Sequence, residues 1–550
     1  MDEVHMKPTS ASISFRQNGV LRTLDLLAEE GNGFFEIETI FEDSKCRVAL
    51  TPKKPVEIAE LRLVFPYELD QEESIFMNGY QSWTVCKEYS IETTNIVAER
   101  LAKILDHKHT DRAGDREFTS YPKQNRWLHG VSYGYVRKAS AFRFFGSLAE
   151  QKGFTFFDID TEAQTLTVRR DLENRIFDEM FTAFDLLFAE GSENEVFDAY
   201  FEALGIPPVA EKPVIGYTTW YRHQQDISEK KLLSDIKDLT DVHAKYPCSV
   251  FFIDEGYENA IGDWLTPQKI PFPHGLEQVT KKILESSMRA GIWIAPFVCD
   301  KKSSIYKHHN DWLLRDPSGE PVLACQSWKD LYCIDFSNLS FRHHLKNVLL
   351  TMRDDWGISV FKFDFLYAVC SVPSPEKTRG EKMYEAIRFL KDCVGDSITI
   401  GMGVPLMSAA GIFDYCQVTC DYSPEWFPPL THAGREQNST YRALVDLIGH
   451  RHLSGRAFNI FNNVIPINNK TFLFAEDKRM LLAKAQGLSH GMVLTSDDLT
   501  HFSGDDIVLW NTILSHRDAK IDSVYTKDRK LVVEYTLFEQ PHKLYISLLE

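Results

Sequence analysis

Residues Ser359–Leu366 read SVFKFDFL, a short apolar run with one lysine and one aspartate set into it. Runs of this kind recur between amphipathic segments, and they begin at Val214, Ser249, Gly291, Ser359, Ser397, Cys416, Ala457 and Met492. Continuous apolar strands are typical of a parallel sheet that is buried on both faces. Eight strand and helix units within about 290 residues predict a (β/α)8 TIM barrel, with an open doubly wound sheet as the alternative.

The chain before the barrel has a different pattern, because apolar residues alternate with period two. The clearest runs are Phe35–Phe41, Leu61–Tyr67, Phe142–Leu148 and Leu166–Leu172. Many short strands of this kind predict an N-terminal β-sandwich. Helices are predicted over Glu92–His109 and Glu193–Gly205, and the pair Pro207-Pro208 marks the boundary to the barrel.

Two strand-like runs, starting at Leu531 and Lys543, predict a small C-terminal β-sheet domain. The predicted domains are therefore residues 1–205, a β-sandwich; residues 206–505, the barrel; and residues 506–550, the β domain. Within the barrel, helices are predicted over Ser228–Ala244 and Ser340–Gly357.

Composition narrows the classes of function. The 550 residues carry a formal net charge of -18, which argues against nucleic acid as a partner. The start lacks a signal-peptide pattern, and no run of about 18 uncharged apolar residues follows, so we expect a cytoplasmic protein without a membrane partner. Ten cysteines without a CxxC pair suggest reduced thiols. The histidines show no metal-ligand spacing, so neither a metal nor a cofactor is expected, and a homo-oligomer remains open.

Polar residues gather where the predicted barrel strands end. They are Asp254-Glu255, Lys362, Asp364, Asp421, Asn462-Asn463 and Asp497-Asp498. The C-terminal strand ends form the active site of such barrels, so these side chains should converge. We expect the carboxylate beside Lys362 to stay ionised as a nucleophile, while a second carboxyl in a less polar setting holds a proton. Two such groups are the minimum for cleaving a glycosidic bond.

Taken singly, an aspartate at a strand end is usually a cap or turn residue, and a tryptophan usually packs in a core. Several aspartates interleaved with tryptophans favour a sugar site instead. The tryptophans at or after predicted strand ends are Trp220, Trp264, Trp293 and Trp426.

Seven motifs, in order along the chain, resemble the α-galactosidases (melibiases) of glycoside hydrolase family 36. They are NGYQSW (Asn78–Trp83), TWY (Thr219–Tyr221), IDEGYENAIGDWL (Ile253–Leu265), GIWIAPF (Gly291–Phe297), FKFDFLYA (Phe361–Ala368), CDYSPEW (Cys420–Trp426) and SDDL (Ser496–Leu499). The resemblance implies the same three-domain fold and a small carbohydrate substrate. It also implies a retaining, exo-acting α-glycosidase that removes terminal α-galactosides by double displacement.

The resemblance assigns roles to single residues. Asp364, in the K-x-D-F motif, would be the nucleophile, and Asp421, in D-x-x-P-x-W, the acid/base. The substrate-binding residues would be Asp254, Lys362, Trp220, Tyr221 and Trp293, together with Trp83 from the N-terminal domain.

Three further residues expected at the sugar depart from the family pattern: Glu255, Gln417 and Met402. Glutamate replaces a shorter aspartate, glutamine replaces an arginine, and methionine replaces a cysteine or small residue, so a different sugar becomes an alternative. The sequence leaves open an α-N-acetylgalactosaminidase, an α-glucosidase or a transglycosylase. A non-catalytic carbohydrate-binding protein ranks lower, since both catalytic carboxylates are present. A metal-dependent hydrolase ranks lower still, because no two histidines lie near the predicted strand ends in a ligand-like pattern.

Overall fold

The computed structural model describes residues 7–28, 33–42, 44–93, 114–115, 118–119, 126–210, 214–325, 328–428, 436–468 and 472–549. The helix predicted over Glu92–His109 lies outside these residues from position 94 onward.

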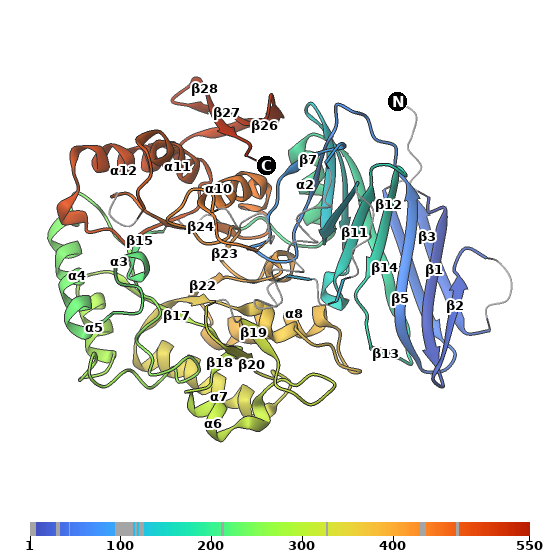
Figure 1. Cartoon of the computed structure of the whole chain (residues 1–550), viewed down its shortest axis with the longest axis horizontal. Coiled ribbons are helices and arrows are strands. Elements are labelled where there is room, and N and C mark those ends of the chain that lie inside the picture. Colours follow the sequence, from blue (N-terminus) through green and yellow to red (C-terminus); the bar gives the residue numbers. More distant parts are fainter. Residues whose placement is uncertain are drawn as a thin grey trace.

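Two seven-stranded antiparallel sheets form the N-terminal part of the molecule (Figure 1). The first sheet runs β2 (Val20–Asp25), β1 (Ser10–Gln17), β5 (Val56–Pro66), β12 (Thr165–Arg170), β11 (Thr155–Asp160) and β8 (Trp127–Val131), with β13 (Ile176–Phe177) on β5. The second runs β3 (Phe35–Glu42), β4 (Lys45–Pro52), β14 (Phe181–Gly191), β10 (Ala141–Ser147), β9 (Tyr133–Lys138), β6 (Ser74–Met77) and β7 (Glu88–Ser90). Apolar side chains from both sheets, such as Phe65 and Phe184, form one core, which confirms the predicted sandwich.

The second sheet also packs on the rest of the chain through its outer face. Helix α2 (Glu193–Ala203) begins with a capping box formed by Ser192 and Glu195. Its Phe197 stacks on His452 with ring centroids 3.9 Å apart, and His452 Nε2 lies 2.8 Å from the Tyr133 hydroxyl of β9. A mixed aromatic layer therefore joins the sandwich to the barrel.

The central sheet closes into a barrel of eight parallel strands, which excludes the open-sheet alternative. The strands are β15 (Ile215–Thr218), β16 (Val250–Ile253), β17 (Arg289–Ile294), β21 (Ile358–Phe363), β22 (Ile398–Gly401), β23 (Tyr415–Gln417), β24 (Asn459–Ile465) and β25 (Met492–Thr495). Each overlaps one of the eight predicted runs. Side chains such as Phe252, Val360 and Leu494 form a buried cluster contributed by the barrel strands.

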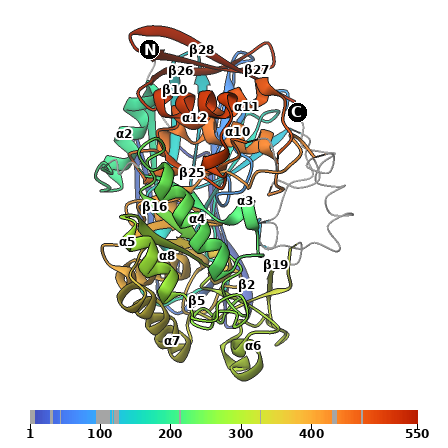
Figure 2. The same ribbon diagram turned by 90° about the vertical axis from the view of Figure 1, so that its left-hand side faces the viewer.

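Helices surround the barrel in Figures 1 and 2. They are α3 (Trp220–His223), α4 (Glu229–Val242), α5 (Glu277–Glu285), α6 (Ser304–His308), α7 (Leu339–Leu350), α8 (Arg379–Val394), α9 (Leu406–Ala409), α10 (Thr440–Gly449), α11 (Glu476–Leu488) and α12 (Gly504–His516). The helix predicted over Ser340–Gly357 is α-helical only to Leu350. It continues as a π-helical turn over Thr351–Asp355 and stops at Gly357, whose φ is 70°.

A small antiparallel sheet is inserted between β17 and β21, made of β18 (Val298–Asp300), β20 (Leu331–Cys333) and β19 (Leu323–Cys325). A second lies at the C-terminus, where β26 (Lys520–Lys527), β27 (Lys530–Leu537) and β28 (Gln540–Ser547) cover α10 and α12 in Figure 2. The sequence predicted only β27 and β28. The predicted boundary at 505/506 falls inside α12, and the division into three domains stays a prediction.

Candidate active site

Strands β16 and β21 bring a buried lysine and a buried carboxylate together. Lys362 Nζ lies 2.7 Å from Asp254 Oδ2, and the Thr218 hydroxyl donates to the same oxygen over 2.9 Å. The sequence set Lys362 beside Asp364 on one strand, and the ion-pair partner of Lys362 in the structure is Asp254. Strand β21 ends at Phe363, so Asp364 leaves the pleat and its carboxylate bonds elsewhere. Lys362 acts on Asp364 only through its charge, which lowers the pKa of that carboxyl.

Asp364 is buried, and two N–H groups hold its carboxylate. The Trp293 indole donates to Oδ2 over 3.1 Å, and the Phe365 backbone N–H donates to Oδ1 over 2.7 Å. Phe365 has a φ of 52°, a left-handed conformation that non-glycine residues seldom adopt. Burial, followed by the charge of Asp421, raises the pKa of Asp364 to about 6, so the group is mostly ionised at pH 7.

Asp421 follows β23 and accepts two amide N–H groups on Oδ1. Gln417 Nε2 and Asn463 Nδ2 each lie 3.1 Å from that oxygen. Burial is the main cause that raises the pKa of Asp421. Asp364 and Asp421 follow β21 and β23, two parallel strands of the same barrel, so both lie at its C-terminal end, and the charge of Asp421 also raises the pKa of Asp364. Asn463 was among the polar strand ends expected to converge, but its contact with Asp421 and its φ of 82° in β24 were not visible in the sequence.

The Glu255 carboxylate is bound by Lys329 and Gln225. Lys329 Nζ lies 2.6 Å from Glu255 Oε1, and Gln225 donates to the same oxygen over 2.8 Å. The Glu255 backbone N–H donates to Asp254 Oδ1 over 3.1 Å. Burial raises the pKa of Glu255 to about 7. Lys329 had not been predicted in the site, because it stands between β19 and β20 of the inserted sheet and in none of the eight barrel runs.

Helix α3 places Trp220 and Tyr221 directly after β15. The Tyr221 backbone N–H donates to Ser496 Oγ over 3.2 Å, and its hydroxyl donates over 3.4 Å to the carbonyl of Tyr422, next to Asp421. Trp220 is half-buried on the same helical turn.

An ion-pair network holds this helical turn. Arg222 reaches Asp498 over 3.0 Å and Asp235 over 3.3 Å. Asp235 is buried and also accepts the Tyr217 hydroxyl and His223 Nε2. Asp498, which the sequence placed among the polar strand ends, therefore fixes α3.

Trp83 reaches the barrel although it belongs to the sandwich part of the chain. Its ring meets Phe365 edge-on, with centroids 6.0 Å apart, and it packs against the large cluster that includes barrel residues. The neighbouring Ser82 backbone N–H donates to the Val404 carbonyl, beyond β22, over 3.1 Å. The Asn78–Trp83 segment thus lies on the C-terminal end of the barrel, beside the residue that follows Asp364.

The remaining predicted residues have packing or loop contacts. Met402 is buried in the cluster formed by the barrel strands, against which Tyr221 also packs. Trp264 meets Trp293 edge-on at 5.8 Å, and Trp426 meets Phe474 at 5.5 Å.

Two other residues at strand ends form hydrogen bonds with backbone groups. Asp497 accepts the backbone N–H groups of Ile467 and Asn468, which follow β24. Asn462 donates to the carbonyl of Gln486 in α11.

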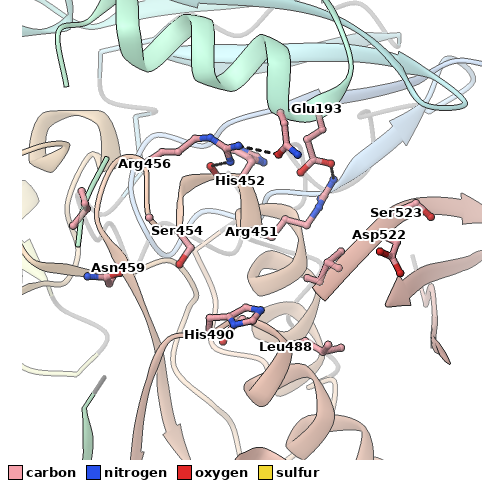
Figure 3. A pocket seen from close by; sticks show the side chains of 15 residues that line it. Glu193, Arg451, His452, Ser454, Arg456, Asn459, Leu488, His490, Asp522 and Ser523 are labelled. Carbon is pink, nitrogen blue, oxygen red and sulfur yellow. Dashed lines mark hydrogen bonds and ion pairs between the residues drawn. The ribbon is translucent and has the colours of Figure 1, made fainter. Parts of the chain in front are cut away.

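A pocket of about 340 Å³ lies at the opposite end of β24, where Asn459 begins that strand (Figure 3). Its guanidinium groups are already engaged, Arg451 with Glu193 and Arg456 with Asp198. No predicted site residue is among those that line it. Within the described part of the chain, no three His, Cys, Asp or Glu side chains come together as a metal site. Nor does any described helix have the length and apolar character needed to cross a membrane.

Known proteins resemble this chain in sequence. Residues 209–393, which contain β15 to β21, match the sequence profile of the family described as Melibiase. Alpha-galactosidase 1 of Pediococcus pentosaceus is 25% identical over 181 residues, covering 31% of this chain and 23% of that protein. Alpha-galactosidase Mel36A of Lactobacillus acidophilus is 23% identical over 198 residues, covering 34% and 26%. The alignments thus span about a quarter of these relatives.

Solved structures are similar over nearly the whole chain. TtGalA, an alpha-galactosidase from Thermus thermophilus in complex with p-nitrophenyl alpha-D-galactopyranoside, has a TM-score of 0.70 and 22% identity, covering 92% of this chain and 98% of its own. The alpha-galactosidase AgaA from Geobacillus stearothermophilus, of glycoside hydrolase family 36, has a TM-score of 0.61 and 12% identity, covering 96% and 73%. The fold is therefore the sandwich-and-barrel fold of these two structures. In its family-level features the chain resembles the melibiase α-galactosidases, as its motifs predict.

Proposed function

We propose that the protein is a retaining, exo-acting α-galactosidase that hydrolyses terminal α-galactosides. One observation carries the proposal: at the same end of the barrel as the buried Lys362–Asp254 pair, the carboxylates of Asp364 and Asp421 are each held by two N–H donors. The melibiase profile and the relatives named alpha-galactosidases support the choice of sugar.

The proposed reaction uses the two carboxyls in turn. The ionised Asp364 attacks the anomeric carbon while Asp421 gives its proton to the glycosidic oxygen, so the leaving group departs as an alcohol. Water then attacks the anomeric carbon, the bond from that carbon to Asp364 breaks and frees the carboxylate, and Asp421 takes the proton from the water. The Trp293 and Phe365 N–H groups orient the attacking carboxylate, and the Gln417 and Asn463 amides orient Asp421.

The proposed sugar contacts come from several elements. Asp254 and Lys362 offer an acceptor and a donor to hydroxyl groups, while Trp220, Tyr221, Trp293 and Trp83 offer aromatic surface to C–H groups. Glu255, Gln417 and Met402 are proposed to tune the choice of sugar. Since Gln417 donates to Asp421, part of its effect would pass through the acid/base.

A related specificity is the second candidate, because Glu255 and Gln417 are engaged by Lys329 and Asp421. The test is kcat/KM on aryl α-galactosides, α-N-acetylgalactosaminides and α-glucosides, with Gln417→Arg as the probe. A preference for α-galactoside supports the proposal. A preference for another α-glycoside, altered by Gln417→Arg, supports the second candidate. Product analysis with a sugar acceptor separates hydrolysis from transglycosylation, and absence of turnover on every glycoside contradicts both.

We also propose that the protein works in a reducing compartment such as the cytoplasm. All ten cysteines are free and buried, so none contributes a disulfide. When the purified protein is denatured, thiol titration should find ten free thiols, and a lower count contradicts the proposal.

A further inference from the structure

Helix α3 is a single turn of four residues that follows β15, and its own sequence does little to fix its position. Its N-cap, Thr219, makes no side-chain capping hydrogen bond. Its C-cap, Gln224, has a φ of 49°, which non-glycine residues seldom adopt. A helix this short is not stable by itself, because it has too few internal hydrogen bonds. The position of Trp220 and Tyr221 therefore depends on contacts between this turn and other elements.

Arg222 makes the charged contacts of the turn. Its guanidinium lies 3.0 Å from Asp498 Oδ2, in the loop after β25, and 3.3 Å from Asp235 Oδ1 on α4. Asp498 also accepts the Thr500 backbone N–H on Oδ1 over 3.1 Å, and His501 Nδ1 lies 2.9 Å from its Oδ2. Arg222 thus ties α3 to the end of the last barrel strand and to the helical layer outside it.

Tyr221 connects α3 to the loop that carries Asp421. Its hydroxyl donates over 3.4 Å to the carbonyl of Tyr422, the residue that directly follows Asp421. Burial, followed by the charge of Asp421, raises the pKa of Tyr221, so the phenol keeps the proton that it donates. A displacement of α3 would therefore break this hydrogen bond or move the backbone beside Asp421.

We propose that Arg222 and Asp498 are positioning residues for Asp421, and that they act through Tyr221 and the Tyr422 carbonyl. The inference rests on the proposed function, in which Asp421 gives its proton to the leaving group. A proton donor must lie within hydrogen-bond reach of the atom that it protonates, so a small displacement of Asp421 slows this transfer. The loss should be confined to substrates whose leaving group needs the proton.

The test uses Asp498→Asn, Tyr221→Phe and the double variant in the full chain. Asparagine keeps a side-chain oxygen for the Thr500 backbone N–H and removes the charge that Arg222 contacts. Phenylalanine removes only the hydroxyl that reaches Tyr422.

Glu385→Gln is the matched control, because it also changes a partly buried carboxylate to an amide. Glu385 lies on α8 and pairs with Arg342 over 2.7 Å and with Lys377 over 2.6 Å, and it makes no contact with α3 or Asp421 among the described residues. Melting temperatures equal to that of the wild type show that each variant is folded.

The kinetic measurement is kcat/KM on two substrates of the sugar that the wild type accepts. A methyl glycoside needs its leaving group protonated, and a glycosyl fluoride does not. We expect Asp498→Asn and Tyr221→Phe each to lose about ten-fold on the methyl glycoside and nothing on the fluoride. The double variant should lose no more than the larger single loss, because both changes act on one path. Equal losses on the two substrates, losses that multiply in the double variant, or the same losses in Glu385→Gln overturn the inference.

A second measurement reports the position of α3 without turnover. In the chain labelled with fluorotryptophan, the fluorine NMR signal of Trp220 is assigned by Trp220→Phe. This signal should shift in Asp498→Asn and stay in place in Glu385→Gln. An unchanged signal in Asp498→Asn overturns the inference whether or not the wild type is active. A shifted signal in a protein that hydrolyses no glycoside would keep Asp498 as the residue that fixes α3 and would overturn its link to proton transfer together with the proposed function.

Discussion

Lys362 Nζ and Asp254 Oδ2 lie 2.7 Å apart, and both side chains are almost fully buried at the strand ends of the barrel. Lys362 is paired with Asp254, and the carboxylate of Asp364 instead accepts hydrogen bonds from the N–H groups of Trp293 and Phe365. The charge of Lys362 is thus neutralised by Asp254 and not by Asp364, the proposed nucleophile. This arrangement keeps Asp364 basic enough to attack, and because its pKa is about 6 the carboxyl is still mostly ionised at neutral pH.

Removing one partner of that pair should be costly. In Lys362→Met the Asp254 carboxylate is buried without its ion pair, so we expect a loss of about 3–5 kcal/mol of unfolding free energy. Denaturant unfolding measures it. In Lys362→Met/Asp254→Asn the buried charge is gone, and we expect most of the stability to return without activity. Equal stability of the single variant and the wild type would contradict the buried pair.

Asp364→Asn should abolish turnover, because an amide cannot form the glycosyl ester. We expect a loss on the order of 10⁴-fold or more in kcat, measured on an aryl α-galactoside. The control is Asp241→Asn, an exposed carboxylate on α4, which should keep full activity. Near wild-type turnover by Asp364→Asn would exclude it as the nucleophile.

Asp421→Asn should show a dependence on the leaving group. Natural sugars leave as poor alkoxides and need the proton, so their hydrolysis should fall steeply. A glycosyl fluoride needs no proton, so the first step should persist and the intermediate should accumulate. Mass spectrometry of the quenched enzyme detects that adduct. Equal losses on both substrates would remove Asp421 from the acid role.

The pKa of Asp364 links stability to pH. Burial raises this pKa from the ordinary 3.8 to about 6, so the folded chain holds the proton more tightly than the unfolded chain. Its contribution to stability is present below pH 3.8 and is lost as pH rises through 6. Asp364→Asn does not titrate, so its Tm advantage over the wild type should grow between pH 4 and pH 8. A Tm difference that is constant with pH would contradict the shift.

Trp83→Ala tests whether the sandwich part contributes to the pocket. Since the indole meets Phe365 rather than the sandwich core, we expect a higher KM or an altered sugar preference, with little change in Tm. Phe65→Ala, inside the sandwich core, is the contrasting variant and should lower Tm. A large loss of Tm with unchanged kinetics for Trp83→Ala would assign this residue to packing alone.

The eight barrel strands were predictable because apolar runs bounded by polar residues are a local signal, and every run became a strand. The pairing of Lys362 was not, since spacing along one strand favoured Asp364 while the neighbouring strand end supplied Asp254. Lys329 and Trp328 escaped prediction for a similar reason. They lie in an inserted segment whose position over the barrel depends on contacts distant in sequence. Strand β26 alternates weakly, with few buried positions to mark it.

The contact of the Asn78–Trp83 segment with the barrel has an evolutionary consequence. Backbone hydrogen bonding from Ser82 to Val404 and the meeting of Trp83 with Phe365 make the sandwich a permanent component of the pocket wall. Recombination that exchanged the first 205 residues would therefore alter substrate choice together with stability. Grafting this barrel onto another sandwich should succeed only where the donor brings a matching tryptophan loop, so the two parts are inherited as one functional unit.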